Sequence, residues 1–131
     1  MIGFTSASDT IRKRLQAGEG LLQFDVCYLK NDGKYYQADA DSATTMPVFV
    51  MAAEAISLDA YGAFYMPKSV ITNSAWTWTT GKLLFASTTA GGVVDIDSAP
   101  SGSGDQVQVI GIAMSATQIY FDPNMAIVEI T

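Results

Sequence analysis

The 131-residue chain contains no histidine and a single cysteine, Cys27. Without histidine there is no imidazole to act as a general base, to activate a serine or cysteine, or to ligate a metal. One cysteine can form neither a disulfide within the chain nor a zinc site of several thiolates. We therefore predict that the chain is not an enzyme and holds no metal ion or other cofactor.

Charged residues are also scarce, because they make up 15% of the chain where about a quarter is usual, while 49% of the residues are hydrophobic. This balance excludes a disordered chain, which needs low hydrophobicity and high charge. Long apolar runs are missing too: the longest strictly apolar stretch is Val48–Ala53, far short of the roughly 20 residues of a membrane span. We expect one folded domain with no membrane contact.

Basic residues are the scarcest charged type, seven against 13 acids, which gives a net charge of −6. Residues 83–131 contain no base at all and five acids: Asp95, Asp97, Asp105, Asp122 and Glu129. Such a chain is a poor ligand for a phosphate backbone, so we expect no nucleic-acid partner. The one basic cluster is Arg12, Lys13 and Arg14, which is either a solvated face or a surface that docks on an acidic partner.

The N-terminal segment differs from the rest of the chain. Ser8 or Asp9 can cap a short helix over residues 10–16, which Gly18 and Gly20 would end. We therefore predict an N-terminal arm over residues 1–20 and a separate β-domain over residues 21–131 that folds without it. The first residues lack a charged segment followed by an apolar one, so we expect no signal peptide, and synthesis and folding in a reducing cytosol.

From Leu21 onward the pattern has a period of two, with Leu22, Phe24, Val26 and Tyr28 on one face. Turns such as residues 31–33 (Asn-Asp-Gly) separate many short strands. No helical run is long enough for a parallel crossover. The sequence predicts an all-β, mainly antiparallel barrel or sandwich, and we detect no internal repeat of fixed period.

Two apolar segments are candidate contact sites. Residues 47–56, with Phe49 and Met51, are apolar on both strand faces, which indicates a strand buried on both sides or one at a subunit interface. Trp76 and Trp78 share a face if extended, and either join the core, form an interface or stack on a sugar. We interpret the pairs Asp39–Asp41 and Asp95–Asp97 as solvated loop acids.

The C-terminal part carries a longer pattern of strands and turns. Its segments are Gly81-Lys82-Leu83-Leu84-Phe85-Ala86-Ser87-Thr88-Thr89-Ala90-Gly91-Gly92, Ala99-Pro100-Ser101-Gly102-Ser103-Gly104-Asp105-Gln106-Val107-Gln108-Val109-Ile110-Gly111-Ile112-Ala113-Met114-Ser115-Ala116, Ile119-Tyr120-Phe121-Asp122-Pro123 and Ile127-Val128-Glu129-Ile130. This pattern resembles a module of tailed-phage structural proteins, chiefly capsid decoration (head cement) proteins and head or tail fibres. The resemblance covers residues 81–131, while residues 21–80 fit such proteins by architecture alone.

The resemblance implies a small β-barrel that forms a homotrimer on the outer surface of a phage capsid, where it binds the major capsid protein and stabilises the shell. No catalytic residue is carried over with it. The alternative is a receptor- or glycan-binding module of a head or tail fibre that uses Trp76 and Trp78. The absence of long repeats or a stalk favours decoration over a fibre.

Overall fold

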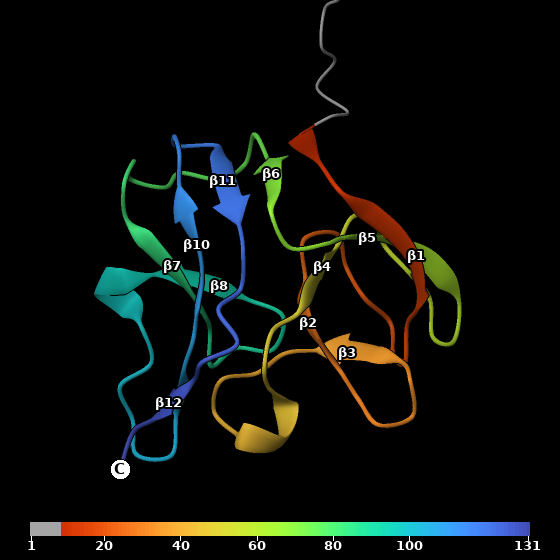
Figure 1. Ribbon diagram of the computed structural model, residues 1–131, viewed down its shortest axis with the longest axis horizontal. Helices are drawn as coiled ribbons and strands as arrows, with labels where there is room; N and C mark the ends of the chain where they lie inside the picture. Colours follow the sequence, from red (N-terminus) through yellow and green to blue (C-terminus); the bar gives the residue numbers. More distant parts are fainter. Residues whose placement is uncertain (1–8) are drawn as a thin grey trace, which may run out of the picture.

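The computed structural model describes residues 9–131, which fold into two five-stranded antiparallel sheets and a separate two-stranded ladder (Figure 1). The first sheet contains β1 (Arg12–Gln16), β2 (Val26–Leu29), β3 (Tyr35–Gln37), β4 (Val50–Ala52) and β5 (Tyr61–Tyr65). The second contains β6 (Ser69–Thr72), β7 (Leu83–Ala86), β8 (Val93–Asp95), β10 (Val109–Ala113) and β11 (Gln118–Phe121). The ladder pairs β9 (Gln106–Val107) with β12 (Val128–Glu129). The prediction of an all-β, mainly antiparallel fold is confirmed.

Two short 3-10 turns, η2 (Ala43–Thr45) and η3 (Ile96–Ser98), follow β3 and β8. Ser42 and Asp95 cap them by accepting a hydrogen bond from a backbone N–H two residues ahead. Within residues 9–131 no helix has the length and apolar character needed to cross a membrane.

The two sheets have the same topology. The strand order is β1-β5-β4-β2-β3 in the first sheet and β6-β11-β10-β7-β8 in the second. If each sheet's strands are numbered by their rank along the chain, both orders read 1-5-4-2-3, and in both a 3-10 turn follows the third strand. Residues 12–65 and 69–121 therefore form two structural repeats, which we call the first and second repeat. The sequence, in which we detect no internal repeat of fixed period, did not predict this structural repeat.

Two short segments of similar sequence recur at equivalent places in the two repeats. Residues 39–43 (Asp-Ala-Asp-Ser-Ala) correspond to residues 95–99 (Asp-Ile-Asp-Ser-Ala), and residues 64–67 (Phe-Tyr-Met-Pro) correspond to residues 120–123 (Tyr-Phe-Asp-Pro). The same spacing along the chain separates the members of both pairs. The segments between them, residues 44–63 and 100–119, are equally long but differ in composition, so the repeat does not stand out in the sequence.

The first sheet is buried on both of its faces. On β2, Val26 and Tyr28 point into the larger core between the sheets, whereas Cys27 points into a smaller core inside the curl of the first sheet. On β4, Met51 enters the larger core and Val50 the smaller one. Successive side chains of a strand face opposite sides, so a strand between two cores must be apolar at every position. This explains the two-sided apolar stretch without a partner chain.

The helix predicted over residues 10–16 is wrong, because this segment forms β1, which pairs with β5 along its whole length. A two-turn helix has little stability of its own, and tertiary pairing with an adjacent strand outweighs its weak local preference. The boundary predicted at residue 20 therefore cuts through the first sheet. Ser8, one of the two proposed caps, lies outside the described residues.

The architecture is a sandwich and not a closed barrel. The first sheet curls until Ala17, just beyond β1, makes a single parallel bridge to Tyr35 on β3, and the Gly18 N–H donates to the Tyr35 carbonyl at 2.8 Å. One bridge links the two edges of the sheet without a continuous ladder. The two sheets lie side by side in Figure 1, with β1 at one side of the molecule and η3, which follows β8, at the other.

A buried glutamine joins the two repeats. Gln108 lies between β9 and β10, is fully buried, and makes two hydrogen bonds with Val48, which precedes β4. Its Oε1 accepts from the Val48 N–H at 2.8 Å, and its Nε2 donates to the Val48 carbonyl at 3.0 Å and to the Asn124 carbonyl at 2.9 Å. The side-chain amide thus takes the place of a neighbouring strand for Val48, whose backbone would otherwise be buried without partners.

The turn between β7 and β8 also crosses from the second repeat to the first. The Gly91 carbonyl accepts from the Val26 N–H at 3.1 Å, and the Gly91 N–H donates to the Ala38 carbonyl at 2.8 Å. Gly91 has φ of 76°, and a Cβ there would lie 2.7 Å from Asp25 Oδ1. The glycine is therefore required both by its conformation and by the close approach of Asp25.

We predict that Gln108→Leu lowers the free energy of unfolding by about 2–4 kcal/mol, because it leaves the two buried backbone groups of Val48 without partners and removes the bond to the Asn124 carbonyl. The measurement is chemical denaturation followed by tryptophan fluorescence. Gln118→Leu is the matched control, since Gln118 is partly exposed and bonds a side chain on the surface. Equal stability of the two variants would contradict the role given to Gln108.

We also predict that deletion of residues 2–16 destabilises the fold by about 3 kcal/mol or more, because it removes β1 and opens the smaller core. The triple variant Arg12→Ala/Lys13→Ala/Arg14→Ala keeps the strand and should lie within about 1 kcal/mol of the parent chain. Thermal unfolding followed by circular dichroism measures both. A deletion variant as stable as the parent would mean that the remaining sheet does not depend on β1.

Candidate functional site

The basic triplet lies on β1, the exposed first strand of the first sheet. Arg12, Lys13 and Arg14 are all exposed. In the register with β5, Arg12 and Arg14 are opposite Tyr65 and Ala63, whose side chains contact the larger core, whereas Lys13 is opposite Phe64 of the smaller core. Strand alternation therefore places the two arginines on one face and the lysine on the other. In a helix the three side chains would point in three different directions around the axis. In the strand, Arg12 and Arg14 share one side and Lys13 lies on the other, so the two arginines can bind the same partner group.

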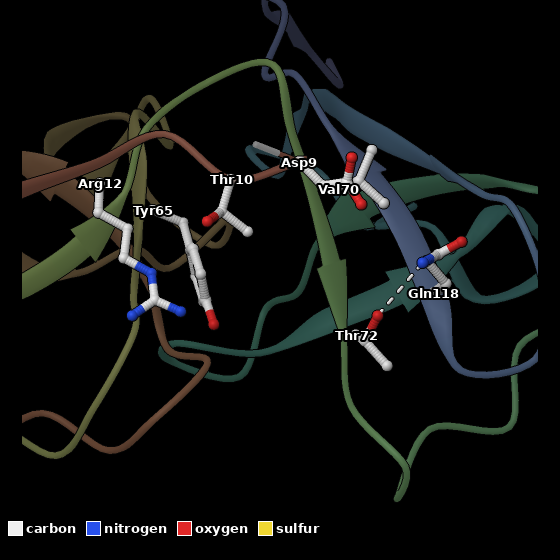
Figure 2. A pocket seen from close by; sticks show the side chains of 7 residues that line it. All are labelled: Asp9, Thr10, Arg12, Tyr65, Val70, Thr72 and Gln118. Carbon is white, nitrogen blue, oxygen red and sulfur yellow. Dashed lines mark hydrogen bonds between the residues drawn. The ribbon is translucent and has the colours of Figure 1, made fainter. Parts of the chain in front are cut away.

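A groove opens beside β1, where the first and second sheets diverge (Figure 2). It has a volume of about 660 Å³ and is lined from both repeats, by Asp9, Thr10, Arg12, Tyr65, Val70, Thr72 and Gln118. The Arg12 guanidinium lies over the Tyr65 ring, 5.1 Å from its centroid. On the opposite wall, Gln118 Nε2 donates to Thr72 Oγ1 at 3.3 Å. The groove therefore offers one cation held by an aromatic ring, together with the Asp9 carboxylate and several neutral polar groups.

Arg12 faces this groove without a carboxylate bound to it in the described part of the chain, where the ion pairs are Lys34–Asp59 and Lys82–Asp97. Residues 1–8 contain no acidic side chain. The guanidinium therefore keeps its hydrogen-bonding fork free for an acceptor from outside, and a carboxylate is the acceptor whose geometry matches that fork.

The structure assigns Phe49 and Met51, both proposed as interface residues, to the interior. Met51 is 0% exposed and belongs to the larger core. Phe49 is partly buried, packs against the smaller core and stacks on Tyr35 with ring centroids 6.4 Å apart. Of the two interpretations of this stretch, burial on both faces is the correct one, so the stretch lends no support to self-association.

Trp76 and Trp78 lie in the connection between β6 and β7 and pack against the larger core. Their rings are 6.1 Å apart, and Trp76 also contacts Phe24 at 5.2 Å. Phe24 lies between β1 and β2, the equivalent connection of the first repeat. The Trp78 indole N–H is buried and has no hydrogen-bond partner. The pair thus joins the two repeats, and a part of each ring stays exposed.

The other candidate groups do not converge on a reaction centre. Cys27 is fully buried, which raises the pKa of its thiol, and Asp25 and Glu19 add to this effect. Asp41 hydrogen-bonds to Asp39, and this contact raises the pKa of the Asp41 carboxyl, with both side chains in a loop. Among residues 9–131, no three acidic or cysteine side chains gather in a way that could hold a metal ion.

A second free edge, at β8, was missed by sequence reasoning. β8 ends the second sheet, and it runs directly into η3 with Asp95, the exposed Ile96 and Asp97. Asp97 forms an ion pair with Lys82, and this raises the pKa of the lysine. The pair Asp95–Asp97 was visible in the sequence, but its place on a sheet edge follows only from the strand order.

No family model, no curated protein and no solved structure matches this chain significantly. The candidate site is therefore defined by the structure alone: it consists of the edge strands β1 and β8 and the groove beside β1.

We predict that Trp76→Ala lowers the free energy of unfolding by about 2–3 kcal/mol, somewhat less than for a fully buried tryptophan, because part of its ring is exposed. Tyr61→Ala is the control, since Tyr61 is 56% exposed and its loss should cost about 0.5 kcal/mol or less. Urea unfolding of both variants gives the comparison. An unchanged stability for Trp76→Ala would favour a surface platform over a core position.

Proposed function

We propose that this chain is a structural virion protein of a tailed phage, a decoration protein that binds the outer surface of the capsid as a homotrimer and stabilises the shell. Such a protein acts by mass action, because it binds the assembled lattice and not the free capsid subunits. A trimer also gains effective concentration when several of its contacts meet a symmetric site.

The observation that carries this proposal is how the phage-like sequence pattern lies in the fold. Its Gly-led segment forms β7, the Thr-Thr-Ala-Gly-Gly segment forms the turn to β8, the next forms β9 and β10, and the last two include β11 and β12. The segments thus fall on strands and turns of the second repeat and its ladder: they include β7, β9, β10 and β12 in full and most of β11, whereas β6 and β8 lie outside them. This agreement supports a resemblance between folded units rather than a similarity of isolated residues.

The surface supports a binding role over a catalytic one. Large apolar side chains are exposed on it, among them Leu22 (69%), Leu58 (64%) and Val128 (67%). The groove beside β1 presents a guanidinium with no bound carboxylate in the described part of the chain. Apolar contacts together with a free cation suit a protein surface that carries acidic side chains.

The structure gives less support to the alternative, a receptor- or glycan-binding module of a head or tail fibre. A glycan platform needs an exposed aromatic face, whereas Trp76 and Trp78 pack against the larger core and keep only part of their rings exposed. We therefore keep decoration as the proposal.

The test is binding of the purified chain to heads of its phage that were assembled without it. We expect saturable binding at hundreds of copies per head and a higher temperature of head disruption. The variant Arg12→Ala/Arg14→Ala should bind less tightly, and the loss should shrink at high salt because exposed charges are screened. Lys13→Ala, on the opposite face of β1, is the single-charge control and is compared with Arg12→Ala alone. Heads that take up no protein, or a few copies at the tail only, would contradict the proposal.

A further inference from the structure

The two sheets have four edge strands, β1 and β3 in the first and β6 and β8 in the second. The residues next to the two ends of β1 contact two of the other edges: Ala17, just beyond β1, makes a single bridge to Tyr35 on β3. At β6, one edge of the second sheet, Ser69 Oγ accepts from the Ile11 N–H at 2.9 Å and donates to its carbonyl at 3.3 Å. The other two edges are β1 and β8, which in the described structure pair on one side only. A free strand edge presents unpaired N–H and C=O groups that can pair with another chain.

The two free edges carry opposite charge. Residues 11–16, which we call the basic edge, contain Arg12, Lys13 and Arg14 and no acid. Residues 93–97, the acidic edge, contain Asp95 and Asp97 and no base, although Lys82 offsets part of that charge through its ion pair with Asp97. Each edge also presents one exposed isoleucine, Ile11 at 50% and Ile96 at 48%. The two edges thus match in charge and in apolar content.

We propose that the basic edge of one copy of this chain binds the acidic edge of a second copy, so that copies associate head to tail. This inference rests on the self-association in the proposed function and specifies which surfaces meet. Pairing of two basic edges would bring three cations against three, and pairing of two acidic edges would bring carboxylates together, so like-with-like pairing is disfavoured. The charge pattern therefore selects the heterologous contact over a twofold one.

The placement of the edges fits this arrangement. In Figure 1, β1 lies at one side of the molecule, and η3, which follows β8 and carries Asp97, lies at the other, so one copy can contact two neighbours at once. A head-to-tail contact generates a ring if the rotation closes and a filament if it does not. The groove beside β1 (Figure 2) leaves room next to Arg12 for side chains of the incoming copy.

The experiment uses the full chain without capsids. We measure its association by sedimentation at low and high salt, and expect oligomers at micromolar concentration that weaken as salt rises. Arg12→Glu/Arg14→Glu should weaken association at least tenfold. Lys30→Glu/Lys34→Glu changes the net charge equally in the β2–β3 turn and should change association less than threefold. Circular dichroism checks that each variant is folded.

Charge reversal on both edges is the decisive variant. Asp95→Asn/Asp97→Lys removes the acidic charge while Asn keeps a side-chain oxygen to cap η3. Combined with Arg12→Glu/Arg14→Glu, it should restore association to within about threefold of the parent chain, because the edges are again complementary. A monomeric parent chain, association that survives Arg12→Glu/Arg14→Glu, or a folded combined variant that stays monomeric would each overturn the proposal.

A cross-linking measurement covers the case in which a charge variant does not fold. The double variant Ile11→Cys/Ile96→Cys should form disulfide-linked oligomers on mild oxidation, because the two positions meet across the interface. Each single variant should stay unlinked, and native Cys27 is buried and does not compete. Absence of linked oligomers in the double variant also overturns the proposal. Head-to-tail association without binding to heads would leave this inference standing and reject the decoration role.

Discussion

The burial of the first sheet on both faces is the constraint on which the rest of this structure depends. Its strands β2, β4 and β5 separate a small core inside the curl from a larger core shared with the second sheet. A strand in this position must be apolar at every residue, whereas a strand with one solvated face alternates. The chain meets this demand with the run Val48–Ala53 and with small residues such as Cys27 and Ala52, both 0% exposed. Consequently both broad faces of the first sheet are covered by core packing, and the parts of this sheet that remain available to other molecules are its edges and loops.

The structural repeat explains how a chain of this size builds such a core. Equivalent strands of the two repeats supply it: Tyr65 at the end of β5 and Phe121 at the end of β11 both enter the larger core. The connections between the first and second strands of each repeat meet as well, through Phe24 and Trp76. Where the repeats cross, single residues satisfy the backbone polar groups, chiefly Gln108 with Val48 and Gly91 with Val26 and Ala38.

The repeats differ most where they do not touch each other. The first repeat has a basic triplet on its first strand, β1, whereas the second has acids at its third strand, β8, which is the opposite edge in the shared strand order. Residues that pack in the core shared by the two repeats must have complementary shapes. Residues on the outer edges of the sheets are not restricted in this way. Charge of opposite sign on the two edges also guards against pairing of identical edges, a hazard for any β-sandwich with free strands. The same asymmetry gives the proposed assembly its direction.

The sequence by itself determined the all-β, antiparallel class, because period-two patterns and tight turns are local and no helical run is long enough for a parallel crossover. It also located the hairpin of residues 26–37, the two-sided stretch and the basic triplet. Tertiary structure decided the rest. Residues 12–16 became a strand because β5 offers a partner, which no local propensity reports. Phe49 and Met51 turned from candidate contacts into interior residues, since an apolar strand looks the same against its own core or against another chain. The shared strand order and the two charged edges depend on which strands become neighbours, and that is set by packing between residues far apart in the chain.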